Sequence, residues 1–404
     1  MTTDIRKTDN LYFFNNARSF IVILVVMLHI ALAYSGFTKK WWIVVSDEST
    51  LIADIICGAF DIFLMPILFF ISGFFTSSSY DRETPFGFIR KKLKTLYIPW
   101  FAGVILLNPF LVIIIRIARS EDTDWFSLII SYYLKFINLP LTPIQDRTLN
   151  PYFFSHYHLW YLSLLFYFFI GYTLFRIASQ YFGNTSFRIN RKNKNIFLYV
   201  LSMVMLSAIG YSLMYFIFRD SWFVVSILQF QISRILPYIC FFIFGISTYK
   251  NGWLINRSFR FPELLLAAVI LLTPVLLIFT GHMLENHSFA GIFLYGFCRY
   301  AICIFMLIGF LFTVKKYFNK VTSFNRIINR SSFGLYIVHL DIVTLLLFIF
   351  SQHEWLNNPF GEILIIMILS TTIGITLYFG YSKIKKLIIS CLRRCESNEL
   401  RKNV

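Results

Sequence analysis

The fold is set by an apolar stretch close to the N-terminus, RSFIVILVVMLHIALAY at residues 18–34. Between Arg18 and His29, every residue except Ser19 is apolar. A helix of about 20 apolar residues is long enough to cross the hydrocarbon core of a bilayer. The stretch therefore predicts a membrane-spanning helix that carries a histidine at depth.

Nine more apolar runs of this kind follow along the chain. The ten predicted spans lie near residues 17–36, 51–76, 96–115, 158–177, 196–218, 224–249, 262–280, 289–313, 332–350 and 362–382. Charged residues make 14% of the 404 residues, against roughly 25% in a soluble domain. A soluble enzyme of this composition would expose large apolar patches to water. We therefore predict an all-α integral membrane protein, with one polytopic domain over residues 1–404 and a basic cytoplasmic tail at 383–404.

The net charge of +17 reflects topology rather than a nucleic-acid partner. If the N-terminus is cytoplasmic, 28 of the 37 Lys and Arg residues fall in cytoplasmic segments and 7 on the opposite side. This bias follows the positive-inside rule and predicts that both termini are cytoplasmic in a multi-pass protein of the plasma membrane. In an alternative reading, the first run is a secretory signal cleaved after Ala31-Leu32-Ala33.

Arg18 and His29 are expected on one face of the first helix. Eleven residues at 100° each bring them to about 20° apart, and the helix rises ~16 Å between them. A neutral imidazole at mid-bilayer can act as a general base or a nucleophile, or it can simply hydrogen-bond a neighbouring helix. Arg18 is either an interfacial anchor or a binding residue for an anionic cofactor below the histidine.

The first cytoplasmic loop, near residues 80–95, contains the basic run Arg90-Lys91-Lys92-Leu93-Lys94. Such a run either stops translocation or holds phosphate groups, for which Lys acts as a point charge and Arg as a fork. Arg90, Lys91 and Lys94 are the candidate phosphate-binding residues.

Several other ionisable residues fall at membrane depth, where their cost makes each a functional candidate. Arg234 and Arg299 lie within predicted spans, and Asp61 is their expected partner, in either a structural ion pair or a substrate site. His158, at the outer mouth of the fourth span, either contacts a sugar or belongs to an aromatic belt. His339 lies inside the ninth span. The long outer segment at residues 118–157 is where we expect the acceptor to be selected.

Five short motifs, taken in order, resemble the membrane acyltransferase 3 family. The motifs are Arg18 and His29 with ten residues between them, MPILFFISGF at 65–74, KKLK at 91–94 before Ile98-Pro99, HLWYL at 158–162 and SFGLYIVH at 332–339. Within the family, the chain is similar to the glucan biosynthesis protein C group. It departs from the family where Lys91 and Lys94 replace an Arg-x-x-Arg pair, and where His339-Leu340-Asp341 replaces His-His-Pro.

The resemblance implies O-acylation of a carbohydrate on the outer side of the membrane. The donor would be acetyl-CoA or succinyl-CoA from the cytoplasm, and no metal would be needed. By this resemblance His29 is catalytic, and Arg18, Arg90, Lys91 and Lys94 hold the CoA phosphates. The alternative from the residues alone is a secondary transporter that moves a small solute past intramembrane Arg, Asp and His side chains.

Overall fold

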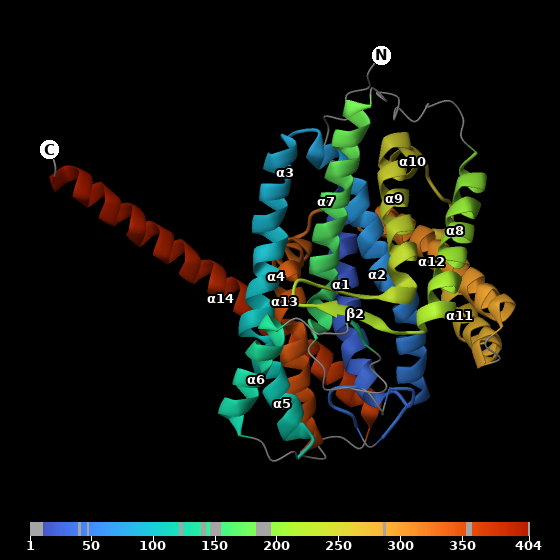
Figure 1. The fold of residues 1–404 in the computed structure, drawn as a ribbon, viewed down its shortest axis with the longest axis horizontal. Coiled ribbons are helices and arrows are strands. Elements are labelled where there is room, and N and C mark those ends of the chain that lie inside the picture. Colours follow the sequence, from blue (N-terminus) through green and yellow to red (C-terminus); the bar gives the residue numbers. More distant parts are fainter. Residues whose placement is uncertain are drawn as a thin grey trace.

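The protein is a bundle of helices with one small sheet at its centre (Figure 1). The computed structural model describes residues 11–38, 42–46, 48–120, 124–138, 143–145, 155–182, 195–285, 288–352 and 358–402. The helices are α1 (Tyr12–Ala31), α2 (Leu51–Tyr80), α3 (Pro85–Lys92), α4 (Ile98–Leu106), α5 (Asn108–Ala118), α6 (Trp125–Ile137), α7 (Trp160–Tyr181), α8 (Ile196–Phe218), α9 (Ile235–Asn251), α10 (Trp253–Asn256), α11 (Pro262–Glu285), α12 (Phe289–Tyr317), α13 (Ser323–Ser351) and α14 (Pro359–Lys402).

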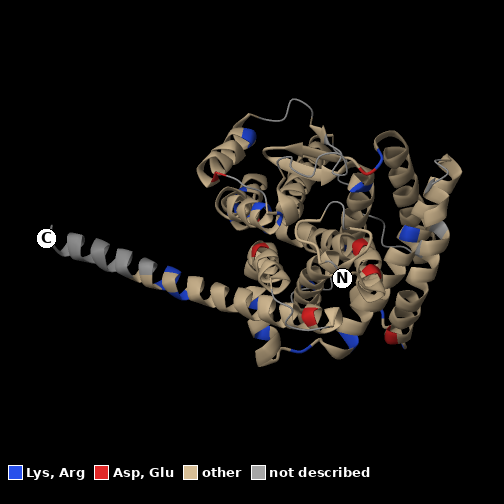
Figure 2. Ribbon diagram, turned by 90° about the horizontal axis from the view of Figure 1, so that it is seen from below, with Lys and Arg blue, Asp and Glu red and all other residues tan. Residues whose placement is uncertain are grey.

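The all-α membrane architecture is confirmed. Among the described residues, nine helical segments are long and apolar enough to cross a membrane. Seen along the bundle, charged residues are sparse on these helices (Figure 2). The predicted span at 262–280 coincides with α11, whose described apolar stretch, Pro262–Leu276, is shorter than a membrane crossing.

Helix α1 lies inside the bundle, in contact with α2, α12, α13 and α14. Polar contacts fix its first turns. Asn16 Nδ2 donates to the carbonyl oxygen of Phe318 at 2.5 Å, and Asn329 Nδ2 donates to Asn16 Oδ1 at 2.7 Å. Helix α1 is therefore packed against helices from the end of the chain.

Helices α2 and α9 cross with their backbones in contact. A Cβ atom added at Gly73 would lie 2.0 Å from the carbonyl oxygen of Phe242, and one at Gly245 would lie 2.0 Å from that of Phe70. Glycine allows such close approach between membrane helices, where packing rather than water exclusion drives association. This crossing brings Asp61 of α2 beside Arg234 at the start of α9.

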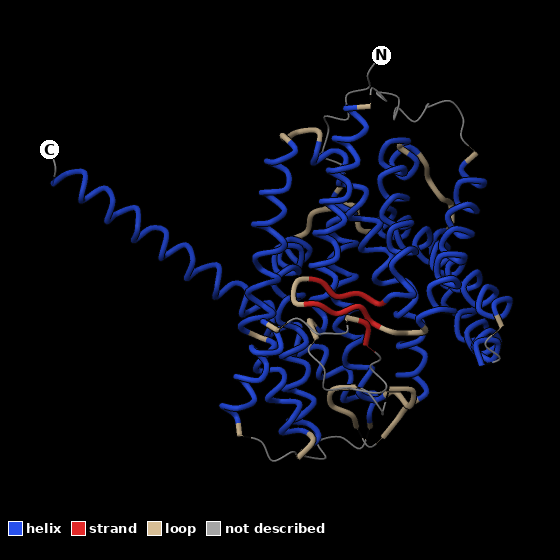
Figure 3. Tube along the Cα trace, viewed as in Figure 1, coloured by secondary structure: helices blue, strands red, loops and turns tan. Residues whose placement is uncertain are grey.

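A β-hairpin interrupts the helical pattern between α8 and α9 (Figure 3). Strand β2 (Trp222–Val225) pairs antiparallel with β3 (Leu228–Gln231), and β1 (Ile144–Gln145) extends the sheet beyond β2. The predicted span at 224–249 is therefore wrong in its first residues, because they form this hairpin. Non-helical backbone is tolerated at membrane depth where protein covers it, and Val224 and Gln229 are fully buried.

Three predicted loops or tails contain helices. Half of the basic segment at 80–95 is α3, which is capped by Thr84: the Thr84 hydroxyl accepts from Gly87 N at 3.0 Å. A π-helix at Leu93–Tyr97 joins α3 to α4. The outer segment at 118–157 contains α6, capped by Asp124. The tail at 383–404 continues α14 as far as Lys402, and this helix projects from the bundle (Figure 1).

Candidate active site

His29 and His339 meet inside the bundle. His29 lies in the last turn of α1, and the side chain of His339 is fully buried in the middle of α13. His29 Nδ1 lies 3.3 Å from His339 Nε2, and the ring centroids are 4.9 Å apart with the planes tilted by 65°. The two residues are 310 positions apart in the sequence, so the packing of α1 on α13 creates this pair.

The backbone partners of the two rings fix their hydrogens. His29 Nδ1 lies 2.7 Å from the carbonyl oxygen of Val25, and His339 Nδ1 lies 2.8 Å from that of Tyr336. A carbonyl only accepts, so each Nδ1 must carry the hydrogen, and each neutral ring keeps its lone pair on Nε2. His339 Nε2 can then accept from His29 Nδ1, which leaves His29 Nε2 with a lone pair and the character of a base.

His158 completes a three-histidine cluster. Its ring centroid lies 4.6 Å from that of His339, and its Nε2 donates to the carbonyl oxygen of Ile337 at 2.8 Å. The hydroxyl of Tyr336 in turn donates to the carbonyl oxygen of His158 at 2.5 Å. These bonds hold the start of α7 against α13. His158 is therefore buried against His339 and α13.

A row of polar side chains leads from this cluster toward Arg18. The Tyr336 ring lies 6.0 Å from the Tyr161 ring, and the Tyr161 hydroxyl lies 3.0 Å from Ser72 Oγ. Arg18 lies within electrostatic range of Tyr161. The Arg18 side chain is exposed although α1 packs against several other helices.

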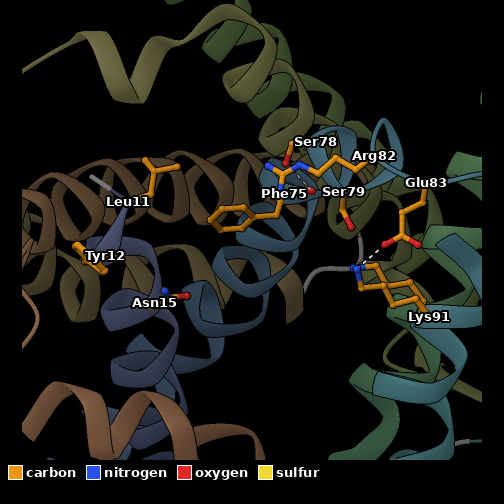
Figure 4. Close-up of a pocket in the computed structure, with 10 residues that line it drawn as sticks. Leu11, Tyr12, Asn15, Phe75, Ser78, Ser79, Arg82, Glu83 and Lys91 are labelled. Carbon is orange, nitrogen blue, oxygen red and sulfur yellow. Dashed lines mark hydrogen bonds and ion pairs between the residues drawn. The ribbon is translucent and has the colours of Figure 1, made fainter. Parts of the chain in front are cut away.

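A cavity of about 380 Å³ lies at the end of the bundle where α1 begins, and Figure 4 shows residues of α1, α2 and α3 around it. Its lining residues are Leu11, Tyr12, Asn15, Phe75, Ser78, Ser79, Arg82, Glu83, Lys91 and Lys92. Lys91 Nζ pairs with Glu83 at 2.5 Å, so one acid partly offsets three cations. Asn15 is one helical turn before Arg18, so one lining residue of the cavity lies on the side of α1 that carries Arg18 and His29.

The predicted phosphate-binding residues do not all reach this cavity. Lys91 lines it, whereas Arg90 and Lys94 are exposed and absent from its lining. Arg82 and Lys92 line it and were not among our candidates. Because the segment is helical, neighbouring cations point in different directions, so a basic run read as a loop could not identify the inward-facing ones.

Asp61 binds both intramembrane arginines, as predicted. Its carboxylate oxygens accept from Arg234 Nη1 at 2.5 Å and Nη2 at 2.7 Å, and Arg299 Nη2 donates to Oδ2 at 2.7 Å. Arg299 Nη1 donates to the hydroxyl of Tyr295 at 3.1 Å. The three charges form one network that joins α2, α9 and α12.

Trp42 and His156 were not among the predicted site residues. The Trp42 ring lies 5.6 Å from the His29 ring. His156 is fully buried, and its backbone N–H donates to Gln229 Oε1 of the hairpin at 2.5 Å. Burial lowers the pKa of His156 to about 3, and hydrogen bonds to the backbone of Val225 and Ser226 oppose this shift. His156 is therefore neutral and ties α7 to the hairpin.

In the described parts of the chain, no group of three His, Cys, Asp or Glu residues is arranged to hold a metal ion. In the histidine cluster, Nδ1 of His29, Nδ1 of His339 and Nε2 of His158 each face a backbone carbonyl. This pattern leaves the other ring nitrogen of each histidine with a lone pair, so these rings can accept protons.

Comparison with known proteins identifies the family. An acyltransferase domain model matches residues 11–379. The chain is 26% identical to glucans biosynthesis protein C of Escherichia coli K12 over 242 residues, and 25% identical to that of Shigella dysenteriae serotype 1 over the same length. Each match covers 58% of this chain and 57% of the relative, and no solved structure matches. The match favours the acyltransferase prediction over the transporter, and the chain belongs to the acyltransferase 3 family of multi-pass membrane enzymes.

Proposed function

We propose that the protein transfers an acetyl or succinyl group from cytoplasmic acyl-CoA to a hydroxyl group of an extracytoplasmic glycan, in the plasma membrane. The observation that carries this proposal is the His29–His339 pair, whose carbonyl partners leave a lone pair on His29 Nε2 inside the bundle. The printed names of the relatives, glucans biosynthesis protein C, support a glycan as the acceptor.

The donor would enter at the end of the bundle where α1 begins. Arg82, Lys91 and Lys92 line the cavity there, and cations of this kind bind the phosphates of CoA. Arg18 would hold a further anionic group deeper in the bundle. The row of hydroxyl groups from Ser72 to Tyr336 would then surround the pantetheine arm as it reaches His29.

In the transfer, the glycan hydroxyl oxygen attacks the thioester carbonyl carbon. A carbon–oxygen bond forms, the carbon–sulfur bond breaks, and the hydroxyl proton moves to His29 Nε2. His29 then returns this proton to the departing CoA thiolate, so the step needs no other reactant. His339 would stabilise the charged form of His29 by accepting from its Nδ1. In a second route, His29 Nε2 attacks the thioester carbonyl carbon first, so that a carbon–nitrogen bond forms, the carbon–sulfur bond breaks and the CoA thiolate departs. The glycan hydroxyl oxygen then attacks the acyl-imidazole, the carbon–nitrogen bond breaks, and the hydroxyl proton passes through His29 to the thiolate.

The test is acyl transfer by purified protein in lipid nanodiscs. Labelled acetyl-CoA or succinyl-CoA is supplied with the glycan fraction extracted from cells that lack the gene, and product glycans are analysed by mass spectrometry. His29→Ala should lower the rate by roughly 10²–10⁴-fold, the usual contribution of a general base. His282→Ala, at an exposed position of α11, is the matched control and should transfer normally. Transfer at the wild-type rate by His29→Ala would refute the proposed mechanism.

A further inference from the structure

In the network of Asp61, Arg234 and Arg299, the Asp61 side chain is the most exposed of the three. The Asp61 side chain is 41% exposed, whereas Arg299 is 5% exposed and Arg234 19%. Two arginines bind this carboxylate, yet much of its surface remains accessible. A purely structural ion network at membrane depth would be expected to cover its carboxylate, because an uncovered charge there is costly.

This network lies at the depth of the histidine cluster. Helices α1 and α2 run antiparallel, with the Phe14 ring 4.3 Å from the Phe74 ring near one end. At the other end, Ser35 Oγ donates to Asp54 Oδ1 at 2.6 Å. Stepping seven residues along each helix from the second contact places Asp61 level with Leu28. The Asp61 carboxylate and His29 therefore lie at about the same height along the bundle.

Aromatic rings connect the two groups. Tyr238, one turn after Arg234, stacks on Trp160 with centroids 5.7 Å apart. Trp160 lies two residues after His158 and packs edge-on against Trp222 of the hairpin at 5.9 Å. Both indole rings are half-buried, so part of each stays available to a ligand. Aromatic rings therefore lie between Arg234 and His158.

The charges of the network favour a neutral ligand. Asp220 approaches the two arginines electrostatically and accepts from Gln231 Nε2 at 2.9 Å. Two acids and two arginines are formally balanced, and an incoming anion would meet the exposed Asp61 carboxylate. A sugar hydroxyl can donate to that carboxylate and accept from a neighbouring guanidinium, and the C–H face of a sugar ring can lie against indole.

We propose that Asp61 and Arg234, with Trp160 and Trp222, form the subsite that binds a neutral sugar ring of the acceptor. The inference rests on the proposed function and specifies the part of the acceptor that this chain recognises. The bound ring would present a neighbouring hydroxyl to His29 Nε2.

The test uses the nanodisc assay with the glycan fraction from gene-deleted cells, separated into neutral and anionic pools. Asp61→Asn and Trp222→Ala should each raise the half-saturating concentration of neutral glycan by about tenfold or more, the loss expected for one charge-assisted contact. The half-saturating acyl-CoA concentration should stay unchanged. Glu263→Gln, which breaks the peripheral Glu263–Lys316 pair of 2.9 Å, and Trp253→Ala are the matched controls.

The outcomes are distinct. If wild-type protein acylates neither pool, the proposed function fails. If it acylates the neutral pool and Trp222→Ala keeps the wild-type half-saturating concentration, the sugar subsite is overturned while the proposed function stands. A wild-type preference for anionic glycan that Asp61→Asn leaves intact would also overturn it. Trp222→Ala decides the question even if Asp61→Asn fails to accumulate in the membrane. Trp222 is uncharged, so its removal leaves no arginine without its ion-pair partner.

Discussion

Replacing His339 by Phe tests whether the two histidines act as a unit. Phenylalanine keeps an aromatic ring in this fully buried position but removes Nε2, which lies 3.3 Å from His29 Nδ1. The carbonyl oxygen of Val25 remains as the second partner of Nδ1, at 2.7 Å. The variant should therefore keep the productive tautomer of His29 and lose part of the stabilisation of its protonated form.

The size of the effect follows from the lost hydrogen bond. When His29 takes a proton, its Nδ1–H belongs to a cation, and a hydrogen bond to a charged group contributes about 1.5–3 kcal/mol. Since about 1.4 kcal/mol corresponds to a tenfold change in rate, kcat should fall by roughly 10- to 100-fold. The half-saturating concentrations of both substrates should be unchanged, because neither is assigned a contact with His339.

A double-mutant cycle gives the decisive measurement. Transfer rates are compared for His29→Ala, His339→Phe and the double variant in nanodiscs, with membrane accumulation and Tm checked for each. If His339 works through His29, the double variant should be no slower than His29→Ala. A double variant slowed by the product of the two single effects would refute the reasoning, and so would unchanged kcat in His339→Phe.

Three further predictions concern packing, donor binding and pH. Gly245→Ala should lower stability by about 1–3 kcal/mol or more, seen as a lower Tm, because its Cβ meets backbone 2.0 Å away, while Gly171→Ala, with open space around it, should have no such effect. Lys92→Met should raise the half-saturating acyl-CoA concentration about tenfold, a loss that shrinks at high salt, whereas the exposed Arg326→Met should not. The pKa of His156 is lowered to about 3 by burial, so below about pH 6.5 the unfolded chain binds a proton that the folded chain refuses. Stability should fall by about 2 kcal/mol between pH 6.5 and pH 5, and His156→Gln should flatten this part of the Tm–pH curve.

The sequence predicted best what depends on local periodicity. The apolar runs identified most helices, and the 100° step placed Arg18 and His29 on one face of α1. Asp61 was identified as the partner of Arg234 and Arg299 because unpaired charges at membrane depth are costly. These predictions used the helical period, the depth of a residue in the membrane and the pairing of opposite charges, all of which can be inferred from one sequence.

The rest depends on contacts between distant segments. His158 and His339 gave no local sign of lying together, since their meeting requires the turn before α7 to pack against the middle of α13. The hairpin was hidden because β2, with the sequence WFVV, is as apolar as the helices around it, and short apolar runs do not distinguish strand from helix. Likewise, Lys92 faces the cavity only because α3 is a helix.

The position of α1 has a consequence for how the protein is made. This helix is synthesised early, yet its partners α12, α13 and α14 come at the end of the chain. His29 and Arg18 must therefore enter the membrane long before the side chains that accompany them in the folded protein. A chain truncated before residue 339 would contain membrane helices but would lack the His29–His339 pair. The enzyme can therefore become active only late in translation. Until then, the first helix lacks the contacts that it makes with these late helices in the folded protein.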